Sequence, residues 1–203
     1  MERKLDDKYF INTFDEKTRI YNKKDNTLLL IVDEQPRLMN ALENGEEAVL
    51  NTLTLIKAFE KYNMPILATE QYPKGLGNTD ERILELIDKN HIFEKTIFDA
   101  ATPEVLDFIE KNNIKKVVII GAEAHICVYQ TTRSLLNLGI DVFLVKDGLA
   151  SFKENQKEEA LKTLREMGAV RTETETILFD LARDSKDPNF KFISGLVKEM
   201  RER

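Results

Sequence analysis

The sequence predicts an α/β three-layer sandwich, in which helices cover both faces of a parallel β-sheet. Short apolar runs alternate along the chain with amphipathic helices, and this alternation is typical of parallel strands joined by right-handed crossovers. The first run, at 27–33, is apolar at consecutive positions, as expected for a strand covered on both faces. A length of 203 residues suits one ordinary domain with a short appendage.

The first half of the chain supplies three predicted strands. The run TLLLIVD at 27–33 is the first, and apolar residues at helical spacing follow it. In order, the expected elements are the strand 27–33, a helix containing Val49, Leu53, Ile56 and Phe59 that stops at 63–65, a strand at 65–69, a glycine-containing loop, a helix at 79–88 and a strand at 91–95.

The second half repeats the pattern. Thr102 and Pro103 form a good helix start, because threonine caps helices and proline is tolerated at the first helical position. The expected elements are the helix from 102, a strand at 116–121, a loop and a helix to about 138, a strand at 141–145, a helix at 154–167, a sixth strand at 169–171 and two short helices.

Residues 1–24 do not fit this pattern. They are polar but carry Tyr9, Phe10, Ile11 and Phe14. We expect an N-terminal arm that packs on the main domain, residues 25–203, or on a neighbouring subunit, and disorder is the alternative.

Charge and composition exclude several classes of protein. Lys and Arg number 30 against 36 Asp and Glu, a net charge of −6, so the chain lacks the basic footprint of proteins that bind nucleic acid or anionic lipid. No apolar run approaches the roughly 20 residues that span a bilayer, and the start MERKLDDKYF has no apolar signal segment. With one cysteine, the chain forms no internal disulfide. We expect a cytoplasmic protein without nucleic-acid or membrane partners.

Three residues at predicted strand ends have side chains suited to catalysis. Asp33 ends the first strand, Lys95 ends the third, and Cys127 begins the helix after the fourth; ligands of open parallel sheets bind at this edge. A helix N-terminus and an ammonium both favour a thiolate, and a carboxylate can accept the thiol proton if burial raises its pKa. On residue type alone the bland alternatives stay open: an inert buried cysteine, a capping aspartate and a solvated lysine.

Several stretches in order resemble the isochorismatase-like cysteine hydrolase superfamily, and within it the isochorismatase domain-containing proteins. They are TLLLIVDEQ, ATEQYPKGLGNT, FEKTIFDA, GAEAHICVYQTTRSLLNLGIDVFLVKDGLAS and the tail TETILFDLARDSKDPNFKFISGLVKE, covering about residues 25–200. The resemblance implies a Rossmann-like sheet of six parallel strands and a Cys-Asp-Lys triad. Asp33 would then be the base, Cys127 the nucleophile, and Lys95 the group that orients or stabilises charge.

The resemblance also implies a reaction and its surroundings. The family chemistry carried onto these residues is hydrolysis of a small amide, ester or related acyl substrate through a covalent thioester, without a cofactor. A non-proline cis peptide is expected at Glu123–Ala124, with backbone N–H groups near Glu123 and at Cys127 as the oxyanion hole. Homo-oligomers are common in the superfamily, so we expect a dimer or larger assembly.

Two departures narrow the activity. Nicotinamidases of the superfamily carry Asp and His metal ligands after the second strand, where this chain has EQYPKGLG, so we expect no metal. The presence of Cys127 favours thiol chemistry over vinyl-ether hydrolysis. The alternative function is a catalytically silent binding or regulatory scaffold with the same fold.

Four further residues are candidates for substrate contact: Gln35, Glu70, Tyr72 and His125. Each has a structural alternative. Gln35 and Glu70 are equally well explained as loop residues, Tyr72 as part of a surface turn, and His125 as a helix-start residue that bonds the backbone or a neighbour.

Overall fold

The computed structural model describes residues 26–203. The six strands are β1 (Thr27–Val32), β2 (Ile66–Gln71), β3 (Ile92–Lys95), β4 (Lys116–Ala122), β5 (Asp141–Ala150) and β6 (Val170–Thr172). They form one sheet in the order β3-β2-β1-β4-β5-β6, and every pairing between these strands is parallel. The strand order reverses between β1 and β4, so this edge of the sheet is where the fold offers a ligand site.

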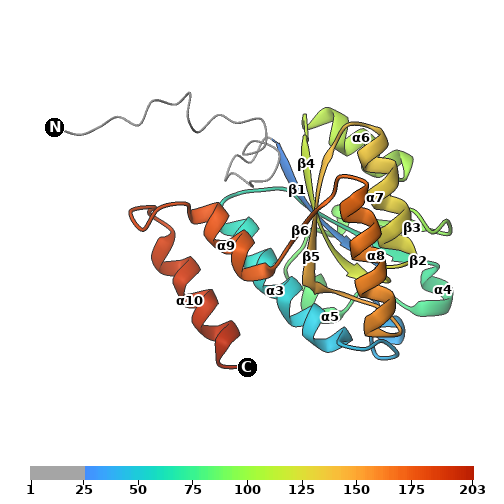
Figure 1. The fold of residues 1–203 in the computed structure, drawn as a ribbon, viewed down its shortest axis with the longest axis horizontal. Helices are drawn as coiled ribbons and strands as arrows, with labels where there is room; N and C mark the ends of the chain where they lie inside the picture. The colour runs from blue at the N-terminus through green and yellow to red at the C-terminus, as the bar shows by residue number, and fades with distance from the viewer. Residues whose placement is uncertain (1–25) are drawn as a thin grey trace.

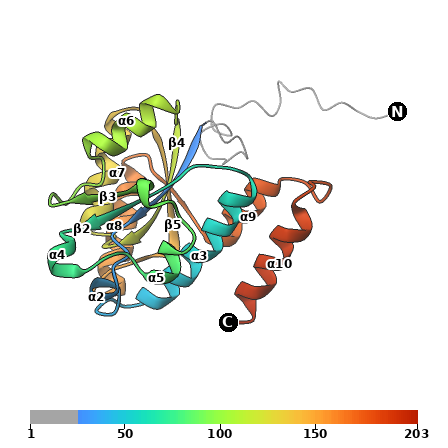
Figure 2. The ribbon, with the colours of Figure 1, turned by 180° about the vertical axis from the view of Figure 1, so that it is seen from behind.

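Helices cover both faces of the sheet (Figure 1). One face carries α6 (Pro103–Lys111), α7 (Cys127–Asn137) and α8 (Glu154–Glu166), and the other carries α3 (Gly45–Lys61), α9 (Thr174–Ala182) and α10 (Phe190–Arg201). Short helical turns lie in the loops at α2 (Pro36–Met39), α4 (Pro73–Leu76), α5 (Glu81–Leu84) and η2 (Lys89–His91). Seen from behind, α10 lies outermost, against α9 and α3 (Figure 2). The predicted sandwich is confirmed.

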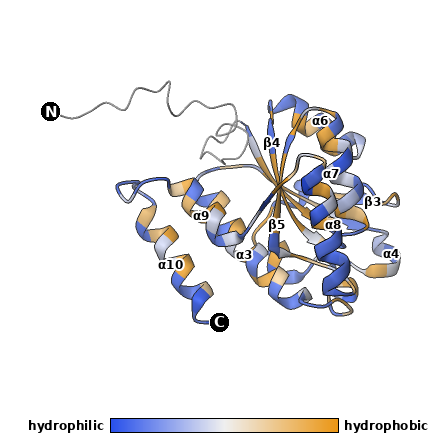
Figure 3. Cartoon of the chain, in the orientation of Figure 1, coloured by the Kyte–Doolittle hydropathy of each residue, from blue (hydrophilic) through white to orange (hydrophobic). Residues whose placement is uncertain are grey.

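The core has two parts because β1 is buried on both faces. Leu29 and Ile31 join the cluster under α3, α9 and α10, whereas Leu28 and Leu30 join the cluster under α6, α7 and α8. Successive side chains of a strand point to opposite faces, so a continuous apolar run serves both clusters. Figure 3 shows the strands as a hydrophobic centre with hydrophilic positions on the outer helices.

Close contact between β1 and β4 requires a glycine. Gly121 has φ +109°, and a Cβ there would lie 2.1 Å from the carbonyl oxygen of Val32. A larger residue would therefore push apart β1 and β4, the two strands between which the strand order reverses.

Two elements differ from expectation. β5 continues to Ala150, past the expected end at 145, because the β4–β5 register shifts between Ile119 and Gly121 and pairing resumes at Leu149. The helix expected at 79–88 is only the single turn α5, because Ile83 is its sole buried residue and Asp88 caps the separate turn η2. The arm expected at 1–24, and hence the domain boundary near residue 25, lies outside the described residues.

Candidate functional site

Asp33 lies where β1 leaves the sheet, in a left-handed backbone conformation with φ +54°. Aspartate tolerates this conformation better than most residues. Its carboxylate is fully buried and accepts a hydrogen bond from Thr69 Oγ1 at 2.8 Å on Oδ1 and from Lys95 Nζ at 2.6 Å on Oδ2. The turn therefore aims a buried carboxylate at the end of β3.

Cys127 is the first residue of α7 and is almost fully buried. Its carbonyl accepts a hydrogen bond from Thr131 Oγ1 at 2.6 Å, and the same hydroxyl accepts one from the Ala100 N–H at 2.7 Å. Thr131 thus ties the start of α7 to the loop that follows β3. This contact fixes the thiol relative to Lys95.

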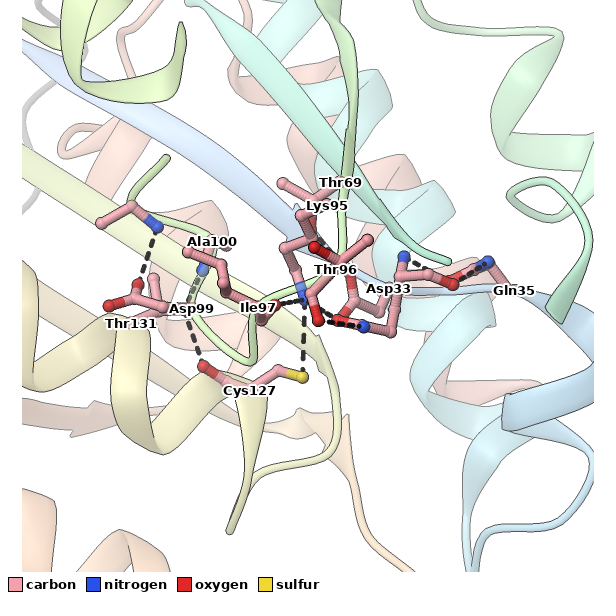
Figure 4. Close-up of polar contacts among 12 residues, drawn as sticks. Asp33, Gln35, Thr69, Lys95, Thr96, Ile97, Asp99, Ala100, Cys127 and Thr131 are labelled. Atoms are coloured by element: carbon pink, nitrogen blue, oxygen red, sulfur yellow. Dashed lines mark hydrogen bonds and ion pairs between the residues drawn. The ribbon is translucent and has the colours of Figure 1, made fainter. Parts of the chain in front are cut away.

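Lys95 joins the other two members of the predicted triad (Figure 4). Its ammonium donates to Asp33 Oδ2 at 2.6 Å, Gln71 Oε1 at 2.6 Å and the Ile97 carbonyl at 3.2 Å, and lies 3.5 Å from Cys127 Sγ. The structure therefore brings Asp33, Lys95 and Cys127 together in a buried cluster.

The electrostatics of the cluster favour a neutral resting thiol. Burial, reinforced by the Asp33 charge and offset only in part by Lys95, raises the pKa of Cys127 to about 12. Burial also raises the pKa of Asp33, and Lys95 and Thr69 oppose that rise. Sequence reasoning stressed the helix terminus and the ammonium, which favour a thiolate. In the folded chain desolvation and the Asp33 charge outweigh both effects on the thiol, and desolvation also makes Asp33 a stronger base.

The cis peptide lies one bond earlier than expected. It is Ala122–Glu123, not Glu123–Ala124. The expected position was wrong because β4 stays paired through Ala122, whose partner is Ala150, and the cis bond is the one by which the chain leaves the strand. The Ala124 N–H donates to the Ala150 carbonyl and is therefore engaged. The Cys127 N–H, at the first position of α7, belongs to the helix-terminal donors that have no partner within the helix.

Two of the substrate candidates point into the protein. Gln35 is fully buried, and its amide bonds the Gln71 N–H, the Gln71 carbonyl and the Gly77 carbonyl. Glu70 accepts from the Thr79 N–H and, as the residue between Thr69 and Gln71 on β2, lies on the opposite face of the sheet from Thr69. These contacts favour the structural alternative for both residues.

The other two candidates lie nearer the surface. Tyr72 is 54% exposed and lines a cavity of about 480 Å³ with Ile97 and Pro103, beside Lys95. His125 is half-buried, with Nδ1 3.1 Å from Ser151 Oγ and 3.9 Å from a carboxylate oxygen of Glu123. His125 therefore has the neighbour contact expected of a helix-start residue, and Tyr72 remains free to meet a ligand.

Sequence reasoning missed three residues that hold the cluster: Thr69, Gln71 and Thr131. Thr69 and Gln71 alternate along β2 and so share the face that carries Asp33 and Lys95. Strand periodicity from the known end of β2 could have found them. Thr131 lies four residues after Cys127, at the spacing by which a helical hydroxyl bonds a backbone carbonyl.

One known protein family matches most of this chain. The isochorismatase domain family matches residues 27–176. The chain belongs to the isochorismatase family. Among its relatives, isochorismatase family protein 1A of Dictyostelium discoideum is 40% identical over 181 residues, covering 87% of this chain and 88% of the relative. A secreted isochorismatase effector of Phytophthora sojae is 34% identical, with 85% of each chain covered.

Solved structures agree with the family assignment. The structure described as MAR1 ribonuclease from Caenorhabditis elegans superposes with a TM-score of 0.83 at 33% identity, covering 89% of this chain and 92% of that one. A nicotinamidase from Staphylococcus aureus, at a TM-score of 0.66 and 23% identity over 73% of this chain and 99% of that one, shares the fold. Within residues 26–203, no helix is long and apolar enough to cross a membrane, and no cluster of three or more His, Cys, Asp or Glu side chains is arranged to hold a metal ion.

Proposed function

We propose that this isochorismatase-family protein is a cysteine hydrolase that cleaves a small amide, ester or related acyl substrate. One observation carries the proposal. The Lys95 ammonium contacts the Asp33 carboxylate and lies within reach of the Cys127 sulfur, in a buried cluster at the strand-order reversal. In such contact the thiol can act as the nucleophile, the carboxylate as its base and the ammonium as the group that orients the base.

The first half of the reaction forms the thioester. Asp33 takes the thiol proton of Cys127 as the sulfur attacks the substrate carbonyl carbon, and the carbonyl π electrons move to oxygen. Backbone N–H groups near Glu123 and at Cys127 hold the oxyanion, and each such donor contributes about 2.7–4 kcal/mol in comparable sites. The C–N or C–O bond then breaks, and the leaving group takes the proton from Asp33.

The second half releases the acid. Asp33 removes a proton from water as the water oxygen attacks the thioester carbon, and the tetrahedral intermediate collapses with cleavage of the C–S bond. Cys127 leaves as a thiolate beside Lys95 and recovers the proton from Asp33. The raised pKa of Asp33 suits both directions of proton transfer.

The test is trapping of the acyl-enzyme with p-nitrophenyl acetate. We expect a burst of p-nitrophenolate and one acetyl group on the peptide that contains Cys127, the only cysteine, and neither in Cys127→Ala. A burst that survives in Cys127→Ala, or no acetylation of Cys127 in the native chain, would favour the silent scaffold instead.

A second candidate function is RNA cleavage, because solved structures 33% and 34% identical to this chain are described as MAR1 ribonuclease and putative MAR1 ribonuclease. Asp33 and Lys95 are a base and an acid, which attack by a ribose hydroxyl would need. The net charge of −6 does not favour a polyanion. Incubation of native protein and Asp33→Asn with single-stranded RNA tests this candidate. Cleavage by this site should be lost in the variant, whereas cleavage by a contaminating nuclease would persist.

We also propose a homo-oligomer in the cytoplasm. A fold relative from Escherichia coli is described as an octameric hydrolase, and Tyr72, Ile97 and Phe98 expose apolar surface near the site. Gel filtration of the full chain and of a variant lacking residues 1–24 tests whether the chain assembles and whether the predicted arm contributes. Fractionation of expressing cells tests the location, since one relative is named a secreted effector.

A further inference from the structure

Gln71 contacts the catalytic lysine directly. It is the last residue of β2 and pairs with Lys95, the last residue of β3, in the parallel register. Paired residues on adjacent strands place their side chains next to each other on the same face. Gln71 Oε1 accepts from the Lys95 ammonium at 2.6 Å, as short as the Lys95–Asp33 ion pair.

The orientation of the Gln71 amide is set from both ends. Its Nε2 donates to the Thr96 carbonyl at 2.9 Å, which directs the oxygen toward Lys95. An ammonium has no acceptor and a carbonyl no donor, so only this orientation satisfies both neighbours. The backbone of Gln71 is fixed as well, because the buried Gln35 amide bonds both its N–H and its carbonyl.

These contacts divide the three N–H donors of Lys95. One goes to Asp33 and one to Gln71, and the Ile97 carbonyl and Cys127 Sγ compete for the third at 3.2 and 3.5 Å. Without Gln71, two donors would be free to rotate toward Ile97 and away from the reacting groups. We propose that Gln71 is a positioning residue that holds the Lys95 ammonium between Asp33 and Cys127, an inference that rests on the proposed hydrolase function.

The variant Gln71→Met tests the inference by a pH profile. A misplaced ammonium opposes the rise of the Asp33 pKa less effectively, so Asp33 needs a higher pH to act as a base. We expect acetylation of Cys127 by p-nitrophenyl acetate to be about tenfold slower at pH 7, with the acidic limb of its pH profile moved upward by about 0.5–1 unit. Gln130→Met, a matched change at a half-buried position of α7, should leave the profile unchanged.

A second readout does not depend on turnover. Buried, hydrogen-bonded ammonium groups exchange protons slowly enough to give an NMR signal, and Lys95→Met identifies the signal of Lys95. Gln71→Met should broaden or shift that signal, and Gln130→Met should not. Gln71→Asn, whose carbonyl falls short of Lys95 by one methylene, replaces Gln71→Met if that variant does not fold.

The outcomes separate the two proposals. An unchanged pH profile together with an unchanged Lys95 signal in Gln71→Met would overturn the positioning role. A native chain that is never acetylated, but whose Lys95 signal changes in Gln71→Met, would overturn the proposed hydrolase function. The positioning of the Lys95 ammonium by Gln71 would still stand.

Discussion

Two adjacent carboxyl groups, Asp33 and Glu34, lie on opposite sides of the sheet in different surroundings. Asp33 faces Lys95 and Cys127, which begins the helix α7. Glu34 faces α3, where Thr52 Oγ1 lies 2.5 Å from its Oε1, while its buried Oε2 has no hydrogen-bond partner among residues 26–203. Both are fully buried, so exposure does not distinguish them. The difference is the presence of a cation in direct contact.

The contacts of Thr52 indicate that Glu34 is a neutral acid. Its hydroxyl lies 3.0 Å from the Ala48 carbonyl as well as 2.5 Å from Glu34, and one hydroxyl proton cannot serve both. A protonated Glu34 that donates to Thr52 satisfies the pair. Burial raises the pKa of Glu34 to about 8, with Asp80 raising it further and Arg82 opposing. Glu34, which contacts no cation within the part of the chain that the structure describes, thus stays protonated, whereas Asp33 has Lys95 to stabilise its charge.

The comparison predicts its largest effect on acylation. Asp33→Asn should slow acetylation of Cys127 by about 10²–10⁴-fold, the usual contribution of a general base. Glu34→Gln should change the rate by less than about threefold, since Glu34 contacts α3 rather than the proposed triad. Stopped-flow release of p-nitrophenolate measures both. Equal losses in the two variants would mean that the pair acts as one unit.

Stability should depend on pH through Glu34. Between pH 4.5 and about 8 the unfolded chain loses the Glu34 proton and the folded chain keeps it. The unfolded state then binds fewer protons, so the stability contributed by this group falls as pH rises and levels off above about 8. Relative to the native chain, Glu34→Gln should gain roughly 4 kcal/mol in the free energy of unfolding from pH 5 to 8.5. Urea titrations at the two pH values measure this, and a constant difference would contradict a neutral Glu34.

Alkylation of the thiol should distinguish the two carboxyl groups with the opposite sign: loss of Asp33 should speed alkylation, whereas it should slow acetylation. The Asp33 charge helps to raise the pKa of Cys127, so Asp33→Asn should alkylate with iodoacetamide about tenfold faster than the native chain at pH 8, although we expect its acetylation to be slower. Glu34→Gln should alkylate at the native rate. Slower alkylation in Asp33→Asn would show that the carboxylate promotes the thiolate in the resting state.

The smallest effects concern the threonine that contacts each carboxyl group. Thr69→Val removes a buried hydrogen bond to Asp33 and should slow acetylation about tenfold while it lowers the free energy of unfolding by about 1–3 kcal/mol. Thr52→Val removes the partner of Glu34 and should lower the free energy of unfolding by about 1–3 kcal/mol while acetylation stays within about threefold. Acetylation kinetics and urea unfolding on both variants measure these effects. An equal loss of acetylation rate in the two variants would remove the distinction between the two sites.

The sequence by itself determined the succession of strands and helices along the chain and the residues at the strand ends. Continuous apolar runs with helices between them specify a parallel sheet, because such strands must be covered on both faces. The motifs around Asp33, Lys95 and Cys127 were sufficient to select these three residues. Thr102 also caps α6 as its place before Pro103 predicted.

Tertiary structure decided everything that depends on contacts between distant elements. The neutral thiol of Cys127 and the contrast between Asp33 and Glu34 follow from desolvation and from a cation that arrives on β3, 62 residues after Asp33. Gln71 became visible only when its pairing with Lys95 placed it beside the ammonium. Burial and charge pairing are properties of the packed chain, and local sequence does not encode which distant side chain supplies the partner.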